Sequence, residues 1–592
     1  MADQNGTRGF VNAATLAFLA RRLKNRRVRA AAVRDPDGAS TEGVDLQRHV
    51  EQAADCLDGI PAWTQDGDLA SVADLPARIP RLSIVALVVG SRGDVQPFIV
   101  IGRRLAERHR VRIATHREFR PLVERAGLEF YPLAGDPHEL MDYMARTGGR
   151  IIPTRVDQLV TDVPRQRAML AEILASTWRA CTEPDPDRPD APPFRADAIL
   201  ANPPSYGHLH CAEALQVPLH MIFTMPWSPT CAYPHPFANI APGGSRPVQN
   251  FLSYGVVDLI VWSGIADLVN AFRQDLLRLP PVSFADGAAL LEDNEVPFTY
   301  LWPASLVPKP ADWGPHIDLA NFTFDDRTPA YEPPAALRDF LAAGEAPIYV
   351  GFGSISVDDP VALTQTIFTA LERAGARGVV SQGWAHLGGA TPPPNVFVVD
   401  DVPHDWLFAR CQAVCHHGGA GTTAAGLRAG LPTVIVPSFG DQLFWGQVVA
   451  DAGAGPTPIP LAQLDSGALA EAFAACRRPE VRDRAHALGA RLRETDGVDL
   501  VVRSVYRHLP LETMGCSTDP EHLATAECDT CAVRLCSDCA RAHAEHRVRP
   551  HRAVHWGPRP SRGLAEELGG LIGDVGHALQ AGLGEVLARA GV

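Results

Sequence analysis

Residues 82–97 of this 592-residue chain read LSIVALVVGSRGDVQP. The first half of the stretch is apolar and rich in β-branched side chains, which is typical of a strand buried on both faces of a parallel sheet. Gly90 ends the apolar run, and a stretch of helical character follows at 95–107. A buried strand that leads through a glycine turn into a helix predicts the first unit of a doubly wound α/β sheet.

The same alternation of strand and helix is repeated along most of the chain. A first set of strands is expected at 82–89, 111–115, 128–132, 198–201 and 219–223, and a second set at 347–352, 378–380, 396–399, 413–415 and 432–436. The proline-rich linker 328–334 separates the two sets. Two Rossmann-like halves joined in this way enclose a cleft, and such sheets bind ligands at the carboxyl ends of their strands.

The composition is that of a large globular enzyme, with 46% apolar and 21% charged residues and a net charge of −14. This balance excludes wholesale disorder and argues against nucleic acid as the general partner. The sequence has no run of 18 apolar residues, so no transmembrane helix is expected. The apolar residues 10–20 precede the basic cluster 21–27, which is the reverse of the order in a signal peptide. A cytoplasmic protein is therefore expected.

The loop 416–423 reads HHGGAGTT and directly follows one of the predicted strands. Its glycines let the backbone close around a phosphate, while Thr422, a histidine and the start of the next helix supply hydrogen-bond donors. An ordinary turn does not need two histidines and three glycines together. The loop therefore predicts a diphosphate site.

Two other loops follow predicted strands and carry polar side chains. The loop 90–97 lacks the Gly-x-Gly-x-x-Gly pattern of dinucleotide-binding proteins, which argues against a dehydrogenase. Its Asp94 lies where the chain enters the helix, and both a capping role and a catalytic role are open. The loop 437–446 reads PSFGDQLFWG, and its Asp441 and Gln442 are suited to hydrogen bonds with neighbouring hydroxyls of a sugar.

Taken in order, these loops resemble the motifs of the sterol glucosyltransferase family, which has the GT-B fold of two Rossmann-like domains facing a cleft. The resemblance extends over about residues 81–510. So many matches in the same order exclude chance similarity. The matching segments are 90–98, 202–208, 223–227, 307–313, 351–354, 403–408 and the loop at 416.

This resemblance implies an inverting transfer of glucose from UDP-glucose to the hydroxyl of a sterol or sterol-like apolar acceptor. It implies that Asp94 is the general base, that His417 and the amides after it stabilise the leaving UDP, and that catalysis needs no metal or other cofactor. The implied donor-binding residues are Ser91, Arg92, Asp94, Gly353, Ser354, Val402, His404, His417, Gly419, Ala420, Gly421, Thr422, Asp441 and Gln442.

The sequence leaves the acceptor open. Aromatic and proline residues at 202–210, 223–227 and 233–237 suit the walls of an apolar pocket. A sterol, a hopanoid-like lipid, a polyketide and other apolar alcohols all fit such a pocket. A competing hypothesis is a catalytically silent binding protein with the same fold, but the presence of all three polar loops favours an active enzyme.

Two features of the sequence bear on the nucleotide base of the donor and on the need for a metal ion. Plant-type enzymes begin the donor motif with a tryptophan that stacks on uracil, whereas Asp401 stands at that position here. Asp-x-Asp triplets, which metal-dependent transferases use, occur at 35–37 and 185–187. Both triplets lie in proline-rich loops without a preceding strand, so they are interpreted as solvated turns.

Five cysteines crowd together near the C-terminal end, in contrast to the scattered cysteines of the preceding chain. Paired cysteines in a long intracellular enzyme favour a metal site over disulfides, and the short gap between the pairs suits two interleaved zinc ions. The segment resembles a B-box zinc finger, although that family begins with Cys-x2-His and Asp519 stands at the cysteine's position before His522. A cysteine-rich tail without metal is the alternative. The predicted ligands are Cys516, His522, Cys528, Cys531, Cys536, Cys539, His543 and His546.

The expected layout has five parts: an N-terminal extension (1–80), an acceptor-binding domain (81–325), a nucleotide-sugar-binding domain (326–510), a zinc module (511–557) and an amphipathic helical tail (558–592). The zinc module is expected to serve docking or assembly. The apolar stripe of the tail leaves self-association, binding of a protein partner and peripheral contact with a membrane surface open.

Overall fold

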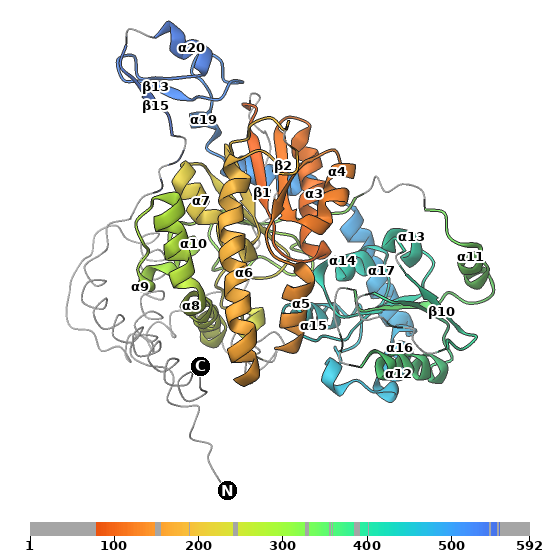
Figure 1. Cartoon of the computed structure of the whole chain (residues 1–592). Helices are drawn as coiled ribbons and strands as arrows, with labels where there is room; N and C mark the ends of the chain where they lie inside the picture. Colours follow the sequence, from red (N-terminus) through yellow and green to blue (C-terminus); the bar gives the residue numbers. More distant parts are fainter. Residues whose placement is uncertain are drawn as a thin grey trace.

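The computed structural model describes residues 79–147, 156–188, 190–238, 247–325, 331–353, 359–383, 391–400, 402–543 and 546–552, with residues 240, 357, 387, 554 and 556. Most of the N-terminal extension, the helical tail, and the predicted donor residue Ser354 lie outside the described residues. Within the described part, two α/β domains lie side by side, and a small module projects from one end of the first domain (Figure 1).

The first domain is built on a seven-stranded parallel sheet with the order β3-β2-β1-β4-β5-β6-β7. The chain moves outward from β1 to β3 and then returns to the other side of β1. The change of direction therefore lies between β1 and β4, where doubly wound sheets bind their ligands. The strands are β1 (Ser83–Leu87), β2 (Arg110–His116), β3 (Glu129–Leu133), β4 (Ala198–Ala201), β5 (Leu219–Phe223), β6 (Phe298–Tyr300) and β7 (Ile317–Leu319).

Helices cover both faces of this sheet, so β1 is buried on both sides as its sequence predicts. Ile84 and Ala86 belong to the apolar core on one face, and Val85 and Leu87 belong to the core on the other. The helices of the domain are α3 (Arg92–Ala106), α4 (Arg120–Arg125), α5 (Pro137–Arg146), α6 (Val156–Thr182), α7 (His208–Leu215), α8 (Pro247–Ala271), the π-helix η5 (Phe272–Leu277), α9 (Phe284–Gly287) and α10 (Leu290–Asp293), with short 3₁₀ turns η2 (Arg117–Phe119), η3 (Pro203–Ser205) and η4 (Pro236–Ala238).

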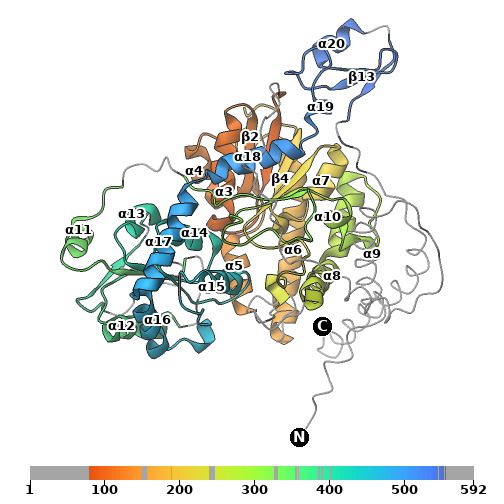
Figure 2. The same cartoon turned by 180° about the vertical axis from the view of Figure 1, so that it is seen from behind.

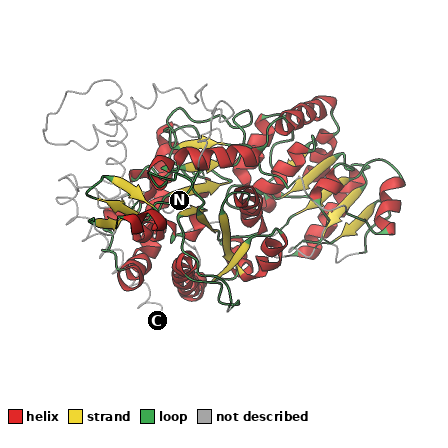
Figure 3. Cartoon of the chain, turned by 90° about the horizontal axis from the view of Figure 1, so that it is seen from above, coloured by secondary structure: helices red, strands yellow, loops and turns green. Residues whose placement is uncertain are grey.

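The second domain repeats the design on a five-stranded parallel sheet with the order β10-β9-β8-β11-β12, and its switch point lies between β8 and β11. Figure 3 shows the strands of both domains with helices around them. The strands are β8 (Ile348–Gly351), β9 (Gly378–Ser381), β10 (Val396–Val399), β11 (Ala413–His416) and β12 (Thr433–Ile435). The helices are α11 (Ala335–Ala342), α12 (Pro360–Arg373), α13 (His404–Phe408), α14 (Ala420–Arg428), α15 (Gln442–Asp451), η6 (Leu461–Gln463), α16 (Ser466–Cys476) and α17 (Pro479–Arg493).

The last helix of the α/β region, α18 (Gly497–His508), returns to the first domain and lies against its sheet (Figure 2). Val501 and Val505 are buried in the core that also contains Ile84. Ser504 donates a hydrogen bond of 2.7 Å to the buried carboxylate of Asp318. The predicted range 326–510 therefore includes a helix that packs on the first domain, because the chain order does not reveal which sheet a terminal helix covers.

All ten predicted strands are present, and two further strands, β6 and β7, extend the first sheet. Each of these has only three residues, which is too short to show a period in the sequence. The interpretation of residues 185–187 as a solvated turn is wrong for Asp185, which is buried. Its carboxylate accepts hydrogen bonds of 2.7 and 3.0 Å from Arg120, so the two residues form an ion pair.

By length and composition alone, one helix among the described residues is long and apolar enough to cross a membrane, namely α8 with its continuation to Leu277. Phe251, Tyr254, Trp262 and Val269 of this helix are buried in the apolar cores of the first domain. A helix that packs in a domain core passes the same test.

The small module that follows α18 consists of α19 (Leu511–Met514), α20 (Ser537–Ala542) and three antiparallel strands in the order β14-β13-β15. The strands are β13 (Ala526–Cys528), β14 (Val533–Leu535) and β15 (Val548–Pro550). Leu511 and Met514 insert into the core of the first domain, so α19 joins the module to that domain.

Candidate active site

The loop after β1 holds Asp94 in a defined position at the start of α3. Ser91 is the N-cap residue, and the carboxylate of Asp94 accepts hydrogen bonds from the Ser91 amide (2.8 Å) and hydroxyl (3.2 Å). Gly90 has φ +140°, and a Cβ there would stand 2.3 Å from the Asp94 carboxylate. The loop therefore needs glycine at position 90, because a side chain there would be strained by the positive φ and would collide with the Asp94 carboxylate.

The capping role that the sequence left open for Asp94 is real, and it is compatible with a second role. Burial raises the pKa of Asp94 from 3.8 to about 6, while the hydrogen bonds from Ser91 oppose the rise. A general base works best when its pKa lies near the operating pH. Asp94 is thus ionised at neutral pH but basic enough to accept a proton.

Side chains from neighbouring strands fasten the end of β1 on both sides. Asn202 exchanges two hydrogen bonds with the backbone of Val89, at 3.0 and 2.8 Å. His116 accepts a hydrogen bond of 3.3 Å from the amide of Gly90 and contacts the carbonyl of Gly135 through its other nitrogen. Asn202 therefore positions the loop that carries Asp94. From the sequence, this motif residue was expected in the wall of the acceptor pocket.

The loop after β11 has the geometry of an anion site. Gly418 adopts φ +97°, and its amide donates to Nδ1 of the buried His416. Gly419 is the N-cap residue of α14, and no side chain caps this helix. The amides of the first turn of α14 are therefore available to an anion, and the positive end of the helix dipole lies beside them. These amides belong to the predicted donor residues Ala420, Gly421 and Thr422.

His417 stands between the two glycine loops of the second domain. A Cβ at Gly353, which has φ +59°, would be 3.0 Å from the His417 ring. Burial lowers the pKa of His417 to about 4, with a further contribution from His404. The ring is therefore neutral at pH 7, and its Nδ1 is buried without a hydrogen-bond partner among the described residues.

The structure gives Asp441 and Gln442 different surroundings. Gln442 is buried, and its side-chain carbonyl accepts hydrogen bonds from the amides of Ser438 (2.7 Å) and Phe439 (3.2 Å). It therefore shapes the loop that carries it. Asp441 is only half-buried, and one of its oxygens accepts a hydrogen bond of 3.0 Å from Trp445.

The two domains bring their carboxylates close to each other. Burial raises the pKa of Asp441 to about 7, and the negative charge of Asp94 contributes to this rise. A Cβ at Gly440 would contact the ring of Phe237 of the first domain at 3.4 Å. The third loop of the second domain therefore faces the catalytic loop of the first.

Val402 and His404 lie at the start of α13, beside the second sheet. The His404 ring stacks on Phe408 at a centroid distance of 4.6 Å, and its Nε2 is 3.2 Å from the Tyr349 hydroxyl. Ser91 and Arg92 lie at the first loop, where Arg92 is exposed. Apart from Ser354, the predicted donor residues thus all lie on loops or helix starts that follow strands.

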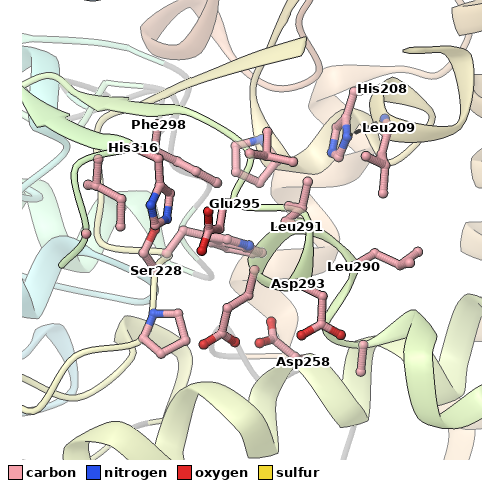
Figure 4. A pocket seen from close by; sticks show the side chains of 18 of the residues that line it. His208, Leu209, Ser228, Asp258, Leu290, Leu291, Asp293, Glu295, Phe298 and His316 are labelled. Atoms are coloured by element: carbon pink, nitrogen blue, oxygen red, sulfur yellow. Dashed lines mark hydrogen bonds between the residues drawn. The ribbon is translucent and has the colours of Figure 1, made fainter. Parts of the chain in front are cut away.

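A cavity of about 530 Å³ lies in the first domain, walled by α7, α8, α10 and the loops around them (Figure 4). Its walls are mainly apolar and aromatic and include Trp227, Trp262 and Trp313. Five carboxylates also line it, at Asp258, Glu292, Asp293, Glu295 and Asp312, with Asp258 and Asp293 pointing into the same space in Figure 4.

The cavity adjoins the catalytic loop through two short segments. Asn202 lines a small pocket at Asp94, and the next residue, Pro203, lines the large cavity. Phe223 lines the small pocket, and its ring lies 5.7 Å from the ring of Trp227 in the large one. The predicted acceptor segments 202–210 and 223–227 therefore form the boundary between the two spaces.

Sequence reasoning missed the part of the cavity that α8 and α10 supply. Asp258, Trp262 and Leu291 come from helices whose residues match no motif. The signal that could have pointed to α8 is its long apolar composition. His208, which the sequence left undecided, lines the cavity, but its Nδ1 accepts the Leu209 amide at 2.7 Å. It has a structural role.

The cysteines and histidines of the module form two groups that alternate along the chain, as their spacing predicts. Cys528, Cys531, His543 and His546 place their ligand atoms within 4.8 Å of one another, and Cys516, Cys536 and Cys539 form the second group. The predicted ligand His522 is in neither group. Its side chain is 55% exposed and lies beside Asp519, and its backbone carbonyl accepts a hydrogen bond from the Cys516 amide.

The fold, with two facing α/β domains, is that of glycosyltransferases of the GT-B type. Residues 84–234 match the glycosyltransferase family 28 N-terminal domain, and residues 383–496 match the erythromycin biosynthesis protein CIII-like C-terminal domain. The glycotransferase of kitacinnamycin has a similar structure, with a TM-score of 0.51, 20% identity, and coverage of 72% of this chain and 99% of that one. A calicheamicin glycosyltransferase has a TM-score of 0.50 at 17% identity, over 72% of this chain and 98% of its own.

Relatives of known activity narrow this class further. Two sterol 3-beta-glucosyltransferases of Arabidopsis thaliana are 48% and 47% identical over 73% of this chain, and one of Emericella nidulans is 36% identical over 81%. The chain belongs to the sterol 3-beta-glucosyltransferase family. It spans 66% and 69% of the length of the plant relatives and 34% of the fungal one.

Proposed function

We propose that this protein transfers glucose from UDP-glucose to the hydroxyl of a sterol or sterol-like acceptor with inversion at the anomeric carbon. The observation that carries the proposal is the position of Asp94, which faces the donor loops of the second domain and adjoins an apolar cavity. Membership of the sterol 3-beta-glucosyltransferase family supports both the donor and the acceptor.

The reaction follows from the placement of these groups. Asp94 accepts the proton of the acceptor hydroxyl as its oxygen bonds to the anomeric carbon. The bond from that carbon to the UDP oxygen breaks on the opposite side. The amides at the start of α14 and the ring of His417 then donate hydrogen bonds to the departing diphosphate. These donors do the work that a metal ion does in other transferases.

The large cavity is the proposed acceptor site. Its volume of about 530 Å³ falls within the range of about 300–1,000 Å³ that is typical of pockets for small ligands. The acceptor would lie between α8 and α10 and extend its hydroxyl past Pro203 and Trp227 to Asp94. A polyketide alcohol is the alternative acceptor, as in the antibiotic transferases of similar fold.

The test uses purified full-length protein with labelled UDP-glucose and, in parallel, a sterol, a hopanoid-like alcohol and a macrolide. A glucoside of the sterol, identified by mass, is the expected product. Turnover at saturating acceptor should persist in the presence of chelators. Exclusive transfer to the macrolide would overturn the sterol assignment, and hydrolysis of the donor without transfer to any alcohol would overturn the acceptor site.

We also propose that the module of residues 511–557 binds structural zinc. Two thiols and two imidazoles converge in the first group, and Nδ1 of His543 is buried without a hydrogen-bond partner among the described residues. Thiolate and imidazole are the ligands that zinc prefers in structural sites. Elemental analysis should find two zinc ions per chain if both groups are filled, and one if only the four-ligand group is. Freshly purified, reduced protein without metal would overturn the proposal.

The remaining proposals concern the location of the protein. We propose a cytoplasmic enzyme that contacts membranes peripherally, because sterols reside in bilayers and the acceptor cavity must be loaded from one. The module, which projects away from both sheets (Figure 1), is proposed to dock a protein partner or a second copy. Flotation with sterol-containing vesicles tests the first idea, and the mass in solution before and after metal removal tests the second.

A further inference from the structure

Near the C-terminal end of the module's range of 511–557, Trp556 docks on the first domain. Its backbone amide donates a hydrogen bond of 3.1 Å to the side-chain carbonyl of Gln216, and the Gln216 amide group donates one of 3.1 Å to the Trp556 carbonyl. The indole Nε1 donates a third, of 2.8 Å, to the carbonyl of Val217. The ring also packs against the apolar core of the first domain.

Gln216 has an unusual backbone for its part in this contact. It ends α7 with φ 58° and ψ 45°, in the left-handed region that favours glycine. A residue with a side chain is strained there. Glycine would relieve the strain but would offer no amide to Trp556. The hydrogen bonds between the Gln216 side chain and Trp556 therefore offset the strain of the Gln216 backbone.

The opposite end of the same helix forms a wall of the acceptor cavity. His208, Leu209 and His210 in the first turn of α7 line the cavity. Arg273 of η5 donates to both oxygens of Glu213, at 2.6 and 3.1 Å, and contacts Nδ1 of His210 at 2.9 Å. The helix is only eight residues long. A shift at Gln216 is therefore transmitted to the cavity wall and not absorbed within α7.

The module holds Trp556 from the other side. His551, just after β15, has its Nε2 2.7 Å from the carbonyl of Thr513 in α19, so the two ends of the module are tied together. Only four residues separate His551 from Trp556. Figures 1 and 2 both show α7 at the end of the first domain that faces α19 and the module.

We propose that Trp556 is a positioning residue for the acceptor cavity, and that the metal-binding module controls it. By docking on the C-terminal end of α7, Trp556 holds the helix whose first turn walls the cavity. When the module loses its metal and unfolds, His551 leaves Thr513 and no longer anchors the chain that leads to Trp556, so Trp556 leaves Gln216. The donor loops lie on other elements and keep their geometry.

This coupling rests on the proposed function in two parts of its experiment: the kinetic constants, and the metal-free sample, which requires the proposed zinc site. Kinetic constants for a sterol acceptor require that the protein glucosylates sterols. Hydrogen exchange of the amides at 208–217 requires no acceptor and reports directly on α7. The two readouts therefore separate a failure of the coupling from a failure of the proposed function.

The experiment compares full-length Trp556→Ala and Gln216→Gly with the wild type. Trp556→Phe keeps an aromatic ring but loses the hydrogen bond of the indole, and it is expected to give an intermediate result. Arg278→Gly is the matched control, because Arg278 has the same φ of 58° and is exposed, without a contact to Trp556. A fourth sample is wild-type protein after removal of its metal with a chelator.

Both loss variants and the metal-free protein should raise the KM for the acceptor roughly 2- to 30-fold, the usual range for residues that couple sites without touching the ligand. Exchange at 208–217 should accelerate in the same samples. The KM for UDP-glucose and the exchange in the second domain should not change, and Arg278→Gly should match the wild type.

Three results would overturn the proposal. Exchange at 208–217 that stays at the wild-type rate in both loss variants would show that Trp556 does not hold α7. Acceleration spread equally over β1, β2 and β3 would show general destabilisation. Protection of 208–217 in protein from which elemental analysis shows that zinc has been removed would separate Trp556 from the module.

Discussion

The proposed donor loops of this molecule are short, contiguous pieces of chain, whereas the proposed acceptor cavity collects residues from position 203 to position 317. Each donor loop follows a parallel strand, and its function depends on backbone: positive-φ glycines, exposed amides and helix starts. The cavity depends on side chains from three helices and several loops. A backbone site requires particular residues at fixed spacing, while a side-chain wall can be built in many ways.

This difference explains why the two sides tolerate change differently. A Cβ added at a positive-φ glycine meets the backbone of Gln442 at Gly418 and the carboxylate of Asp94 at Gly90, so either change disturbs the site. An apolar wall residue can be replaced by another of similar volume at a cost that is usually below about 1.5 kcal/mol. We therefore expect the donor side to fail sharply when altered and the acceptor side to change its preference.

The largest effect is expected at Asp94. Asp94→Asn keeps the shape of the loop but removes the base, so turnover should fall roughly 10²- to 10⁴-fold. UDP binding, measured by calorimetry, should remain close to the wild-type value because the diphosphate lies on the second domain. Turnover at the wild-type rate would remove Asp94 from the role of base.

The next effect tests the backbone of the same loop. Gly90→Ala should lower turnover by roughly 100-fold, because a displacement of the base of about 1 Å has that effect. The cause is the contact at 2.3 Å with the Asp94 carboxylate together with φ +140°. Gly93→Ala is the matched control, since a Cβ at Gly93 would meet nothing closer than 3.6 Å. Equal rates for the two variants would contradict the argument.

A smaller effect is expected at His417, which contributes a hydrogen bond without a charge. His417→Ala should weaken UDP binding roughly 10- to 100-fold, as expected for loss of a hydrogen bond to a charged group. Turnover should fall as well. Calorimetry that shows unchanged affinity for UDP would place His417 outside the diphosphate site.

The smallest effect concerns pH. Because burial raises the pKa of Asp94 to about 6, the carboxyl becomes protonated, and inactive as a base, as pH falls through that value. The kcat/KM for the acceptor should therefore fall about tenfold per pH unit below pH 6. Asp441, with a pKa near 7, titrates together with Asp94, so the profile reports the pair. A flat profile down to pH 4 would indicate an ordinary carboxylate.

The sequence by itself determined the two sheets and the backbone geometry of the proposed donor loops. The strand at 82–89, the glycine turns and the loops at 90 and 416 all encode local backbone geometry, and local geometry is visible in a single stretch of residues. The alternating ligand groups of the module were predictable for the same reason, because metal ligands must occur in closely spaced pairs.

Only the tertiary structure decided where distant segments meet. Asn202 fastens β1, α18 covers the first sheet, and α8 walls the acceptor cavity. His522 stands outside both ligand groups, and Trp556 docks on Gln216. Each of these contacts joins segments that are separated along the chain or depends on the direction of a side chain. Packing of apolar surfaces decides such contacts, and packing follows total shape and volume, which leave no periodic mark in the sequence.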